Sequence, residues 1–432
     1  MSSINHKNQI KTFGCRLNLL ESDLIEKNLD SLNKEILIVN TCAVTNEAEK
    51  QAKQFIRKAS RENPNIKIIA TGCAVQIDPK NWSEMPEVFK TVGNVDKIKK
   101  DTWVNIEDKE QDVSNIVSNI MLEKAVDSFF VSGFRERTRA FLQIQQGCDH
   151  RCTFCIIPFG RGNSRSIDMV SIINNAQKLI DYGHKEIVLT GVDIASWGKD
   201  LTEKSHLGIL IKSLLKKVVG LRRLRLSSID PAEIDNDLME AFSTEKRLMP
   251  HLHLSIQHGN DLILKRMKRR HLARDVERFV DQAKRNRPGI VIGADFISGF
   301  PTESDEAHKS SLELINNLEI CWGHVFPYSP RNGTPASRMP QVEINLRKSR
   351  AKELRLACEK NTKRWMKNQI GSFSNVLMES HNSGHCEYFS NVKLNGRFPK
   401  GSIQRVKIIK SNRSFLEGVS LKNIKKENYE LV

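Results

Sequence analysis

The sequence predicts an α/β protein with three parts: an amino-terminal open parallel α/β domain, a partial (β/α)6 barrel and a small carboxyl-terminal all-β domain. Between residues 9 and 74, short apolar runs alternate with helix-like stretches. A longer alternation follows between residues 140 and 330. Beyond Gly371 only short strand-like runs remain, at 374–380, 387–394, 404–410 and 415–421, separated by turn residues. Alternating strands and helices predict parallel sheets, whereas short strands in series predict a separate β domain.

The length and charge of the chain restrict its class. A chain of 432 residues exceeds what one hydrophobic core serves and predicts two or three domains. The net charge of +17 predicts a polyanionic partner, with nucleic acid as the first candidate, because Lys and Arg release counterions from phosphates. No apolar run approaches the roughly 20 residues that span a bilayer. We therefore expect a cytoplasmic protein without a membrane segment.

Nine cysteines in a reducing compartment predict metal or catalytic sites in preference to disulfides. Three of them come at the ends of successive strand-like runs in the amino-terminal domain, which we place at residues 7–115. They are Cys15 after the run 9–14, Cys42 at the end of 35–42 and Cys73 at the end of 66–73. Because parallel strands end at one edge of a sheet, we expect these thiols to lie together. The alternative is three unrelated buried cysteines.

The second domain, which we place at residues 134–366, contains six strand-like runs, mostly separated by amphipathic helical stretches. The runs are 140–147, 186–191, 223–229, 251–257, 290–299 and 322–330. Such units predict a barrel, or a large part of one, with its chemistry at the carboxyl ends of the strands. A basic helical segment at 345–368 closes this region, and we assign 369–432 to the β domain.

The loop after the first barrel strand, GCDHRCTFC at residues 147–155, contains Cys148, Cys152 and Cys155. A structural zinc site normally takes four ligands, and the nearest fourth candidates are Asp149 and His150. A [4Fe–4S] cluster fits better, because thiolates are its normal ligands. With three thiolates, one iron stays open and can chelate the amino and carboxylate groups of S-adenosylmethionine (SAM).

This C-x3-C-x2-C spacing, with Phe154 before the last cysteine, resembles the radical SAM superfamily. The resemblance implies a radical SAM barrel in which the three loop cysteines hold the catalytic cluster. It also implies cofactor contacts from residues at later strand ends. The matching positions are Gly191, Asp193, Ser227, Ser228, Gln257 and Gly299. Ordinary turn glycines and helix caps are the alternative interpretation of each.

The stretches TFGCRLNLLES, VNTCAVTNEAE and ATGCAVQ resemble the amino-terminal domain of the methylthiotransferases, a radical SAM family. The resemblance implies a second [4Fe–4S] cluster on Cys15, Cys42 and Cys73, and a carboxyl-terminal TRAM-like domain that binds RNA. An unactivated C–H bond has no acidic proton, so sulfur insertion requires a radical to remove hydrogen first. The implied reaction uses SAM twice, as the radical source and as the donor that methylates the inserted sulfur.

The branches of this family differ in substrate. Two modify C2 of adenosine 37, next to the tRNA anticodon, bearing an N6-threonylcarbamoyl or N6-isopentenyl group; a third modifies an aspartate of a ribosomal protein. Arg16 and Leu17, with the stretches RAFLQIQQGCDHRCTFCIIPFGRGNSRS and LKRMKRRH, resemble the threonylcarbamoyladenosine branch. The other two branches stay open as alternatives. A zinc-stabilised, non-catalytic RNA-binding protein is the alternative of another class.

The resemblance also implies the partners: tRNA, a reductant such as flavodoxin or ferredoxin, and a sulfur donor that the sequence does not identify. We expect a monomer. A basic cluster is the candidate for RNA contact, although most basic runs are only solvated helix faces. It consists of Lys265, Arg266, Lys268, Arg269 and Arg270.

A few further residues carry weaker signals. We expect His253 and His258 to be satisfied core histidines, with contact to a cofactor as the alternative. The stretch PYSPRNGTPA at 327–336 resembles a family segment at the last barrel strand, and our hypothesis is a loop that closes over the substrate. Three cysteines match no cluster pattern and predict packed thiols: Cys321, Cys358 and Cys386.

Overall fold

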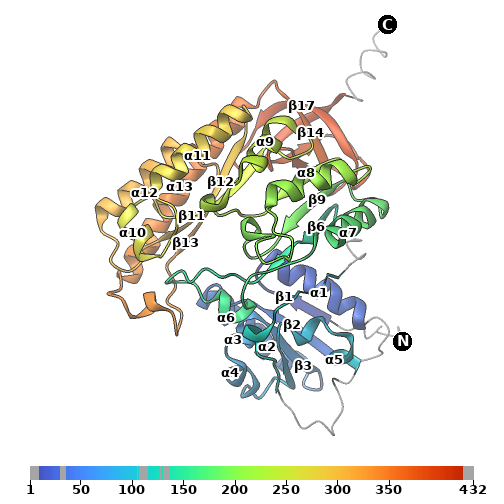
Figure 1. The fold of residues 1–432 in the computed structure, drawn as a ribbon, viewed down its shortest axis with the longest axis vertical. Helices are drawn as coiled ribbons and strands as arrows, with labels where there is room; N and C mark the ends of the chain where they lie inside the picture. Colours follow the sequence, from blue (N-terminus) through green and yellow to red (C-terminus); the bar gives the residue numbers. More distant parts are fainter. Residues whose placement is uncertain are drawn as a thin grey trace.

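The computed structural model describes residues 9–29, 36–104, 106, 115–126, 128, 129 and 137–421. The predicted domain limits at residues 7, 134 and 432 lie outside these ranges. Figure 1 shows three parts that follow the order of the chain: a sheet with its helices, a curved row of strands and helices, and a small β-barrel packed against that row. No helix in the described ranges combines the length and the apolar character needed to cross a membrane.

The amino-terminal part is a parallel sheet in the order β1-β2-β3-β4-β5. Its strands are β1 (Gln9–Thr12), β2 (Ile36–Thr41), β3 (Lys67–Gly72), β4 (Lys90–Val92) and β5 (Asn115–Ile116). The first three are the predicted strands. The sequence does not predict β4 and β5, because runs of three and two residues are too short for a periodic signal.

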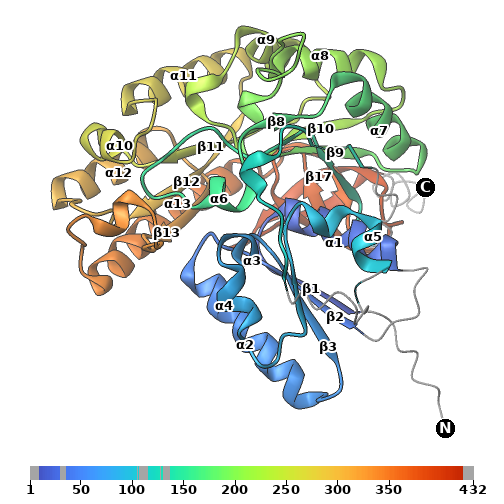
Figure 2. The ribbon, with the colours of Figure 1, turned by 60° about the horizontal axis from the view of Figure 1, so that its bottom comes forward.

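Helices cover both faces of this sheet (Figure 2). Alternate residues of β2 face opposite sides, so that Val39 packs with Ile56 of one helix while Ile38 packs with Ile25 of another. Every residue of β2 is buried, as expected for a strand of a doubly covered parallel sheet. The helices are α1 (Arg16–Leu29), α2 (Asn46–Glu62), α3 (Cys73–Ile77), α4 (Pro79–Ser83) and α5 (Lys100–Val104).

The central part contains all six predicted barrel strands. They form two parallel sheets, β10-β9-β6 and β11-β12-β13, joined by the isolated bridges Leu224–Leu248 and Ile229–Leu254. The predicted partial barrel is thus confirmed as an open arc. The strands are β6 (Arg139–Gln143), β9 (Glu186–Thr190), β10 (Arg223–Leu226), β11 (His251–Gln257), β12 (Val291–Ser298) and β13 (Trp322–Pro327). A two-stranded ribbon, β7 (Gln145–Gln146) with β8 (Arg165–Ser166), follows β6.

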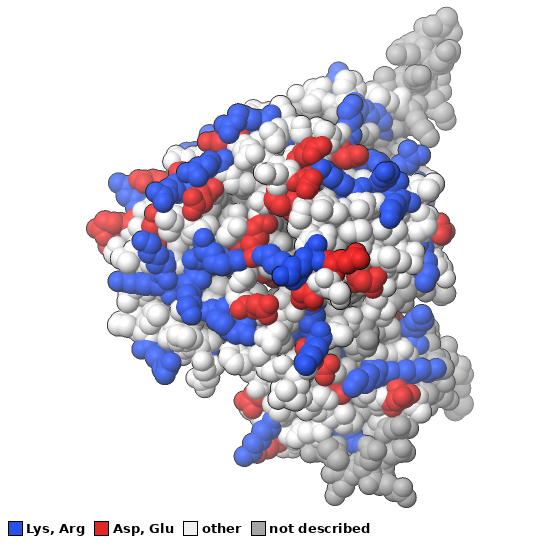
Figure 3. All heavy atoms as spheres, in the orientation of Figure 1, with Lys and Arg blue, Asp and Glu red and all other residues white. Residues whose placement is uncertain are grey.

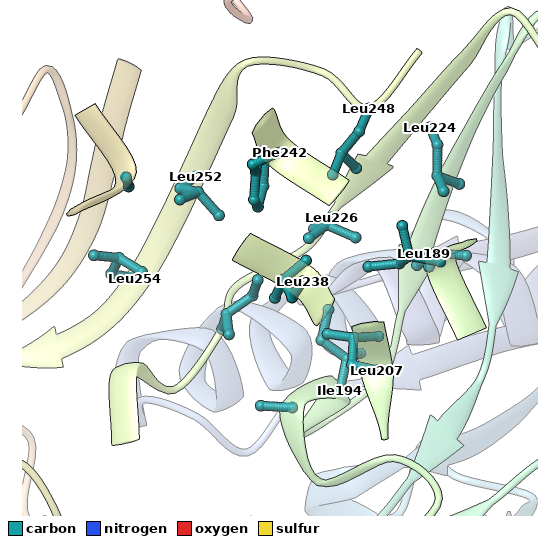
Figure 4. Packing of buried hydrophobic residues seen from close by; sticks show 14 of the residues in the cluster. Leu189, Ile194, Leu207, Leu224, Leu226, Leu238, Phe242, Leu248, Leu252 and Leu254 are labelled. Carbon is teal, nitrogen blue, oxygen red and sulfur yellow. The ribbon is translucent and has the colours of Figure 1, made fainter. Parts of the chain in front are cut away.

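Helices lie outside this arc, and the amino-terminal sheet lies on the other side of the strands (Figure 2). Figure 4 shows the core between strands and helices, where Leu189, Leu224 and Leu252 meet Leu238 and Phe242. The α-helices are α6 (Ile157–Arg161), α7 (Met169–Asp181), α8 (Leu207–Lys217), α9 (Asn236–Thr244), α10 (Asp261–Arg266), α11 (Ala273–Asn286), α12 (Asp305–Asn317) and α13 (Ile344–Asn368). The 3-10 turns of the described residues, in all parts of the molecule, are η1 (Asp96–Ile98), η2 (Ile120–Leu122), η3 (Ile194–Ser196), η4 (Pro231–Glu233) and η5 (Pro335–Arg338).

The carboxyl-terminal part is a small closed barrel in the order β14-β15-β16-β18-β17, which fits a TRAM-like domain. Its strands are β14 (Phe373–Met378), β15 (Ser383–Cys386), β16 (Asn391–Leu394), β17 (Ile403–Ser411) and β18 (Leu416–Ser420). The predicted strand over 387–394 is wrong in its first half. Residues 387–390 form the turn between β15 and β16, and Phe389 adopts a φ of 68° there. Strand-like residue types hide this reversal of the chain.

Candidate functional site

One cavity of about 690 Å³ lies where the three parts meet. Its volume is within the range of roughly 300–1,000 Å³ that is common for ligand sites. Cys15, Cys42 and Cys73 line it from the amino-terminal part, Cys155 lines it from the barrel loop, and Phe389 lines it from the small β-barrel. The cavity therefore connects the two predicted cysteine triads.

The three amino-terminal cysteines reach this cavity because of the sheet topology. Cys15 directly precedes α1, Cys42 directly follows β2, and Cys73 is the first residue of α3 directly after β3. Neighbouring parallel strands bring these positions to one edge. Gly14 fits closely against this site: its φ is 94°, and an added Cβ would lie 2.7 Å from the Cys42 sulfur.

A buried charge network supports this triad from the barrel side. The Nε atom of Arg161 donates to the Cys73 sulfur at 3.0 Å, and the same guanidinium pairs with Glu21. Lys97 Nζ lies 2.6 Å from the second oxygen of Glu21. Burial alone would raise the pKa of Glu21, but Arg161 and Lys97 overcome this effect and lower it. The sequence analysis did not identify this network, since its members are far apart in the chain and match no motif.

The loop triad of Cys148, Cys152 and Cys155 is held mainly by backbone hydrogen bonds. Cys148 N–H donates to the carbonyl of Gly162 at 3.1 Å, and Cys155 N–H donates to the carbonyl of Cys152 at 3.0 Å. Gly147 begins the loop with a φ of 71°, and an added Cβ would lie 1.9 Å from a backbone oxygen. Only glycine fits this entry into the loop.

Three of these thiols, Cys42, Cys148 and Cys155, lie in environments that disfavour free thiolates. Burial raises the pKa of Cys42 to about 12 and that of Cys155 to about 11. Burial, together with the Asp193 carboxylate, also raises the pKa of Cys148. Thiols of this kind coordinate iron only by losing their protons, so the metal replaces a proton at each sulfur. Three thiols per site and one cavity beside both sites fit two iron–sulfur clusters.

Asp193 lies beside the loop triad. Its carboxylate is 4.0 Å from the Cys148 sulfur and 2.9 Å from His150 Nε2, and its backbone N–H donates to Gln145 Oε1 at 2.9 Å. Cys148, His150 and Asp193 lie close enough to bind one ion between them. The zinc alternative therefore has a candidate ligand set here, which metal analysis can test.

The cavity brings together most of the other predicted cofactor residues. Gly191, Ser227, Ser228 and Gln257 all line it, and Gln257 adopts an unusual φ of 71° at the end of β11. Gly299 is not among the lining residues. Its N–H donates to Glu303 at 2.8 Å, and an added Cβ would lie 2.4 Å from the Arg347 side chain. The structure thus places Gly299 in contact with α13, away from the candidate cofactor site.

The predicted basic cluster divides into inward and outward side chains. The side chain of Arg269 points inward and is 8% exposed: its Nη2 lies 3.0 Å from Asp230, and its Nη1 donates toward the Cys152 sulfur at 3.7 Å. Lys265 and Lys268 are exposed. The remaining two arginines bond to neighbouring residues, Arg266 to Thr302 and Arg270 to Asp230 and Glu233. Figure 3 shows Lys and Arg gathered on the face that carries α10. RNA contact there stays a prediction.

The two histidines singled out in the sequence, His253 and His258, have different surroundings. His258 is buried, and its Nε2 lies 3.0 Å from Glu303, as expected of a satisfied core histidine. His253 lines the cavity, with its Nε2 2.9 Å from Asp295, which also lies 3.2 Å from His324. Sequence reasoning missed Asp295 and His324, although both belong to predicted barrel strands. The three leftover cysteines are buried, as predicted: Cys321, Cys358 and Cys386.

The segment 327–336 connects the barrel with the amino-terminal part beside the cavity. Ser329 lines the cavity, and its hydroxyl accepts a hydrogen bond from the N–H of Asn46 at 3.2 Å. The Asn46 amide donates to the carbonyl of Pro330 at 3.1 Å, and Arg331 pairs with Glu49. These contacts hold the segment across the boundary between the two parts.

Comparisons with known proteins agree with this architecture. Residues 142–315 match the model of the Radical SAM superfamily, and residues 7–93 match that of the Uncharacterized protein family UPF0004. The solved structure of the radical S-adenosylmethionine methyltransferase TsrM from Kitasatospora setae, with cobalamin and a [4Fe-4S] cluster bound, aligns with a TM-score of 0.54. The alignment covers 77% of each chain at 14% identity and supports the fold alone.

Two curated relatives share nearly the whole length. The threonylcarbamoyladenosine tRNA methylthiotransferase MtaB of Rickettsia prowazekii is 45% identical over 96% of this chain and 98% of its own. The protein of the same name from Bacillus subtilis is 33% identical over 96% of both chains. Membership of the radical SAM superfamily implies SAM and a [4Fe–4S] cluster as cofactors. This chain belongs to the methylthiotransferase family of radical SAM enzymes and is MtaB-like.

Proposed function

We propose that this enzyme methylthiolates C2 of N6-threonylcarbamoyladenosine at position 37 of tRNA. The observation that carries the proposal is a cavity lined by all three amino-terminal cysteines and by Cys155 of the loop triad, because sulfur insertion needs hydrogen removal and sulfur delivery at the same carbon. The full-length relatives named for this activity and the net charge of +17 support tRNA as the substrate. Such a substrate implies a cytoplasmic enzyme.

In this proposal the two triads have different roles. Cys148, Cys152 and Cys155 hold the cluster that, when bound, supplies the electron for SAM cleavage. Gly191 and Ser227 line the same cavity as Cys155, which supports binding of SAM beside that loop. Cys15, Cys42 and Cys73 hold a second cluster, which supplies the sulfur that is inserted and then methylated. A one-electron reductant such as flavodoxin or ferredoxin and a sulfur donor complete the reaction.

The substrate is tested by mass spectrometry of nucleosides from total tRNA of strains with and without the gene. We expect 2-methylthio-N6-threonylcarbamoyladenosine to disappear on deletion and its unthiolated precursor to accumulate. Loss of 2-methylthio-N6-isopentenyladenosine would still support methylthiolation of tRNA, but it would assign the chain to the isopentenyladenosine branch. No change in either nucleoside would point to the ribosomal-protein branch.

The cofactor content is tested on anaerobically reconstituted protein. We expect about eight irons per chain, because each thiolate triad holds one [4Fe–4S] cluster and each cluster contains four irons. Tightly bound zinc without iron would contradict the proposal and favour the non-catalytic alternative. About four irons would leave one cluster and refute the second triad as a cluster site.

A further inference from the structure

One end of the cavity contains three basic side chains with unused hydrogen-bonding capacity. Arg16, Arg225 and His251 all line the cavity, and they come from the amino-terminal part, β10 and β11 respectively. Phe389 of the small β-barrel stacks on His251 with ring centroids 5.2 Å apart and lies 5.1 Å from the Arg225 guanidinium. All three parts of the molecule thus build this end of the cavity.

The partners of these side chains are incomplete. Arg225 is buried; its Nε donates to Glu186 at 2.8 Å, but its Nη1 has no hydrogen-bond partner in the part of the chain that the structure describes. His251 is also buried, and neither of its ring nitrogens has a partner in the same ranges. Among the described residues, no acceptor bonds to the Arg16 guanidinium. A buried donor without an acceptor is costly, so a ligand that supplies acceptors stabilises this arrangement.

The charge around this end of the cavity favours an anion. Glu186 is already shared by Arg223 and Arg225, and Arg139 is paired with Glu379. Asp295, the lining carboxylate, is engaged by His253 and His324. The positive charge of Arg16 is therefore left without a paired carboxylate in a partly enclosed site. A carboxylate matches the planar donors of a guanidinium better than a neutral group does.

We propose that Arg16, Arg225 and His251 form a subsite for the carboxylate of the substituent on N6 of the substrate adenosine. This inference rests on the proposed function and adds to it the residues that distinguish an acidic substituent from an apolar one. Arg16 supplies the charge, while Arg225 Nη1 and one nitrogen of His251 supply further hydrogen bonds. An apolar substituent leaves all three donors unpaired, and a site built to bond a polar group rejects an analogue that lacks it.

The test compares two anticodon stem-loop RNAs with the reconstituted holoenzyme. They differ only at the threonylcarbamoyl carboxylate, which is a free acid in one and a neutral N-methylamide in the other. For the unaltered enzyme we expect kcat/KM for the acid to exceed that for the amide by about tenfold to a hundredfold, the value of a hydrogen bond to a charged group. In Arg16→Gln this ratio falls to about one to three.

Two further variants separate the subsite from general effects. Arg225→Lys keeps a positive charge near Glu186 but removes Nη1, and it should reduce the ratio about fivefold or more. Arg278→Gln, on the exposed side of α11, removes the same charge as Arg16→Gln and should leave the ratio unchanged. Iron content and SAM cleavage without RNA are measured for each variant, so that damage to the clusters is recognised.

The outcomes distinguish this inference from the proposed function. Equal turnover of both RNAs by the unaltered enzyme overturns the subsite but leaves the proposed function standing. Product from an isopentenyl stem-loop and from neither threonylcarbamoyl RNA overturns the proposed substrate. If Arg16→Gln raises the KM for SAM equally with both RNAs and leaves their ratio unchanged, the bound carboxylate belongs to SAM and the inference is wrong.

Discussion

The two cysteine triads bring three thiols together in different ways. Cys148, Cys152 and Cys155 lie in one loop, which is held by a backbone hydrogen bond from Cys155 to Cys152 and by one from Cys148 to the nearby Gly162. The amino-terminal cysteines lie on separate segments, and only the parallel sheet brings them to one edge. That dispersed triad also depends on Arg161, a residue of the barrel part, whereas the loop triad takes most of its support from its own part of the chain. Close spacing in the sequence is thus enough to bring the loop thiols together, whereas the dispersed thiols meet only when the sheet and the barrel have folded.

The largest expected effects come from removing one thiol of each triad. Cys152→Ala should abolish both 5′-deoxyadenosine formation and methylthiolation, because the loop cluster loses a ligand. Cys42→Ala should keep part of the deoxyadenosine formation while blocking methylthiolation. Cys386→Ala, which removes a buried thiol outside both triads, should keep most activity. The measurement is both products per chain under anaerobic conditions. Normal methylthiolation by Cys42→Ala would contradict the division of roles.

The next effect tests the dependence of the dispersed triad on the barrel. Arg161→Met leaves Glu21 with only one of its two buried cationic partners, and breaking a buried ion pair costs about 3–5 kcal/mol of folding free energy. We expect lower stability in urea and loss of iron from the amino-terminal triad. Arg57→Met, at an exposed ion pair with Glu87, should cost at most about 1 kcal/mol. Equal stability of the two variants would show that the Arg161–Glu21–Lys97 network does not stabilise the amino-terminal triad.

A matched pair of glycines gives the third test. Gly14→Ala places a methyl group against Cys42, whereas Gly147→Ala places one against the backbone of Asn163, next to the Gly162 carbonyl that accepts from Cys148. We expect each variant to lose iron mainly from its own triad. Gly183→Ala has a similar positive φ but open space around the added Cβ, so it should cost only about 1 kcal/mol and no iron. Mössbauer or electron paramagnetic resonance spectra of the two clusters, with iron counts, check the assignment.

The smallest effect concerns pH and chelators. Because burial raises the pKa of Cys42 to about 12 and of Cys155 to about 11, each iron–sulfur bond at neutral pH displaces a proton. Lower pH therefore favours release of iron, and loss to a chelator should be faster at about pH 6.5 than at about pH 8.5. Cys15 is exposed while Cys152 is buried, so the amino-terminal triad should lose iron first. Simultaneous loss from both triads would show that exposure does not distinguish them.

Much of the fold followed from local sequence patterns. The runs that became β2, β3 and β9 are rich in β-branched and apolar residues and end near Gly or Cys, so both their type and their position were predictable. The errors came where the signal was short or ambiguous. β4 and β5 have too few residues for a pattern, and β15 was missed because the turn through Phe389 carries strand-like residue types.

Local sequence patterns also predicted part of the candidate site. The spacing of the loop cysteines determined that motif without any structure, and strand order predicted that Cys15, Cys42 and Cys73 would meet. The sequence by itself therefore determined the fold class, the family resemblance and the two sets of thiols. These depend on spacing and periodicity, which are local properties of the chain.

Only the tertiary structure decided which distant side chains touch. It placed Arg161 on Cys73, turned Arg269 inward toward Cys152, left Gly299 outside the lining of the cavity and brought Arg16, Arg225 and His251 to the same cavity. Local propensity carries no information about such contacts. They arise when packed elements bring side chains from different parts of the chain into one enclosed volume, where unpaired charges and donors must find partners.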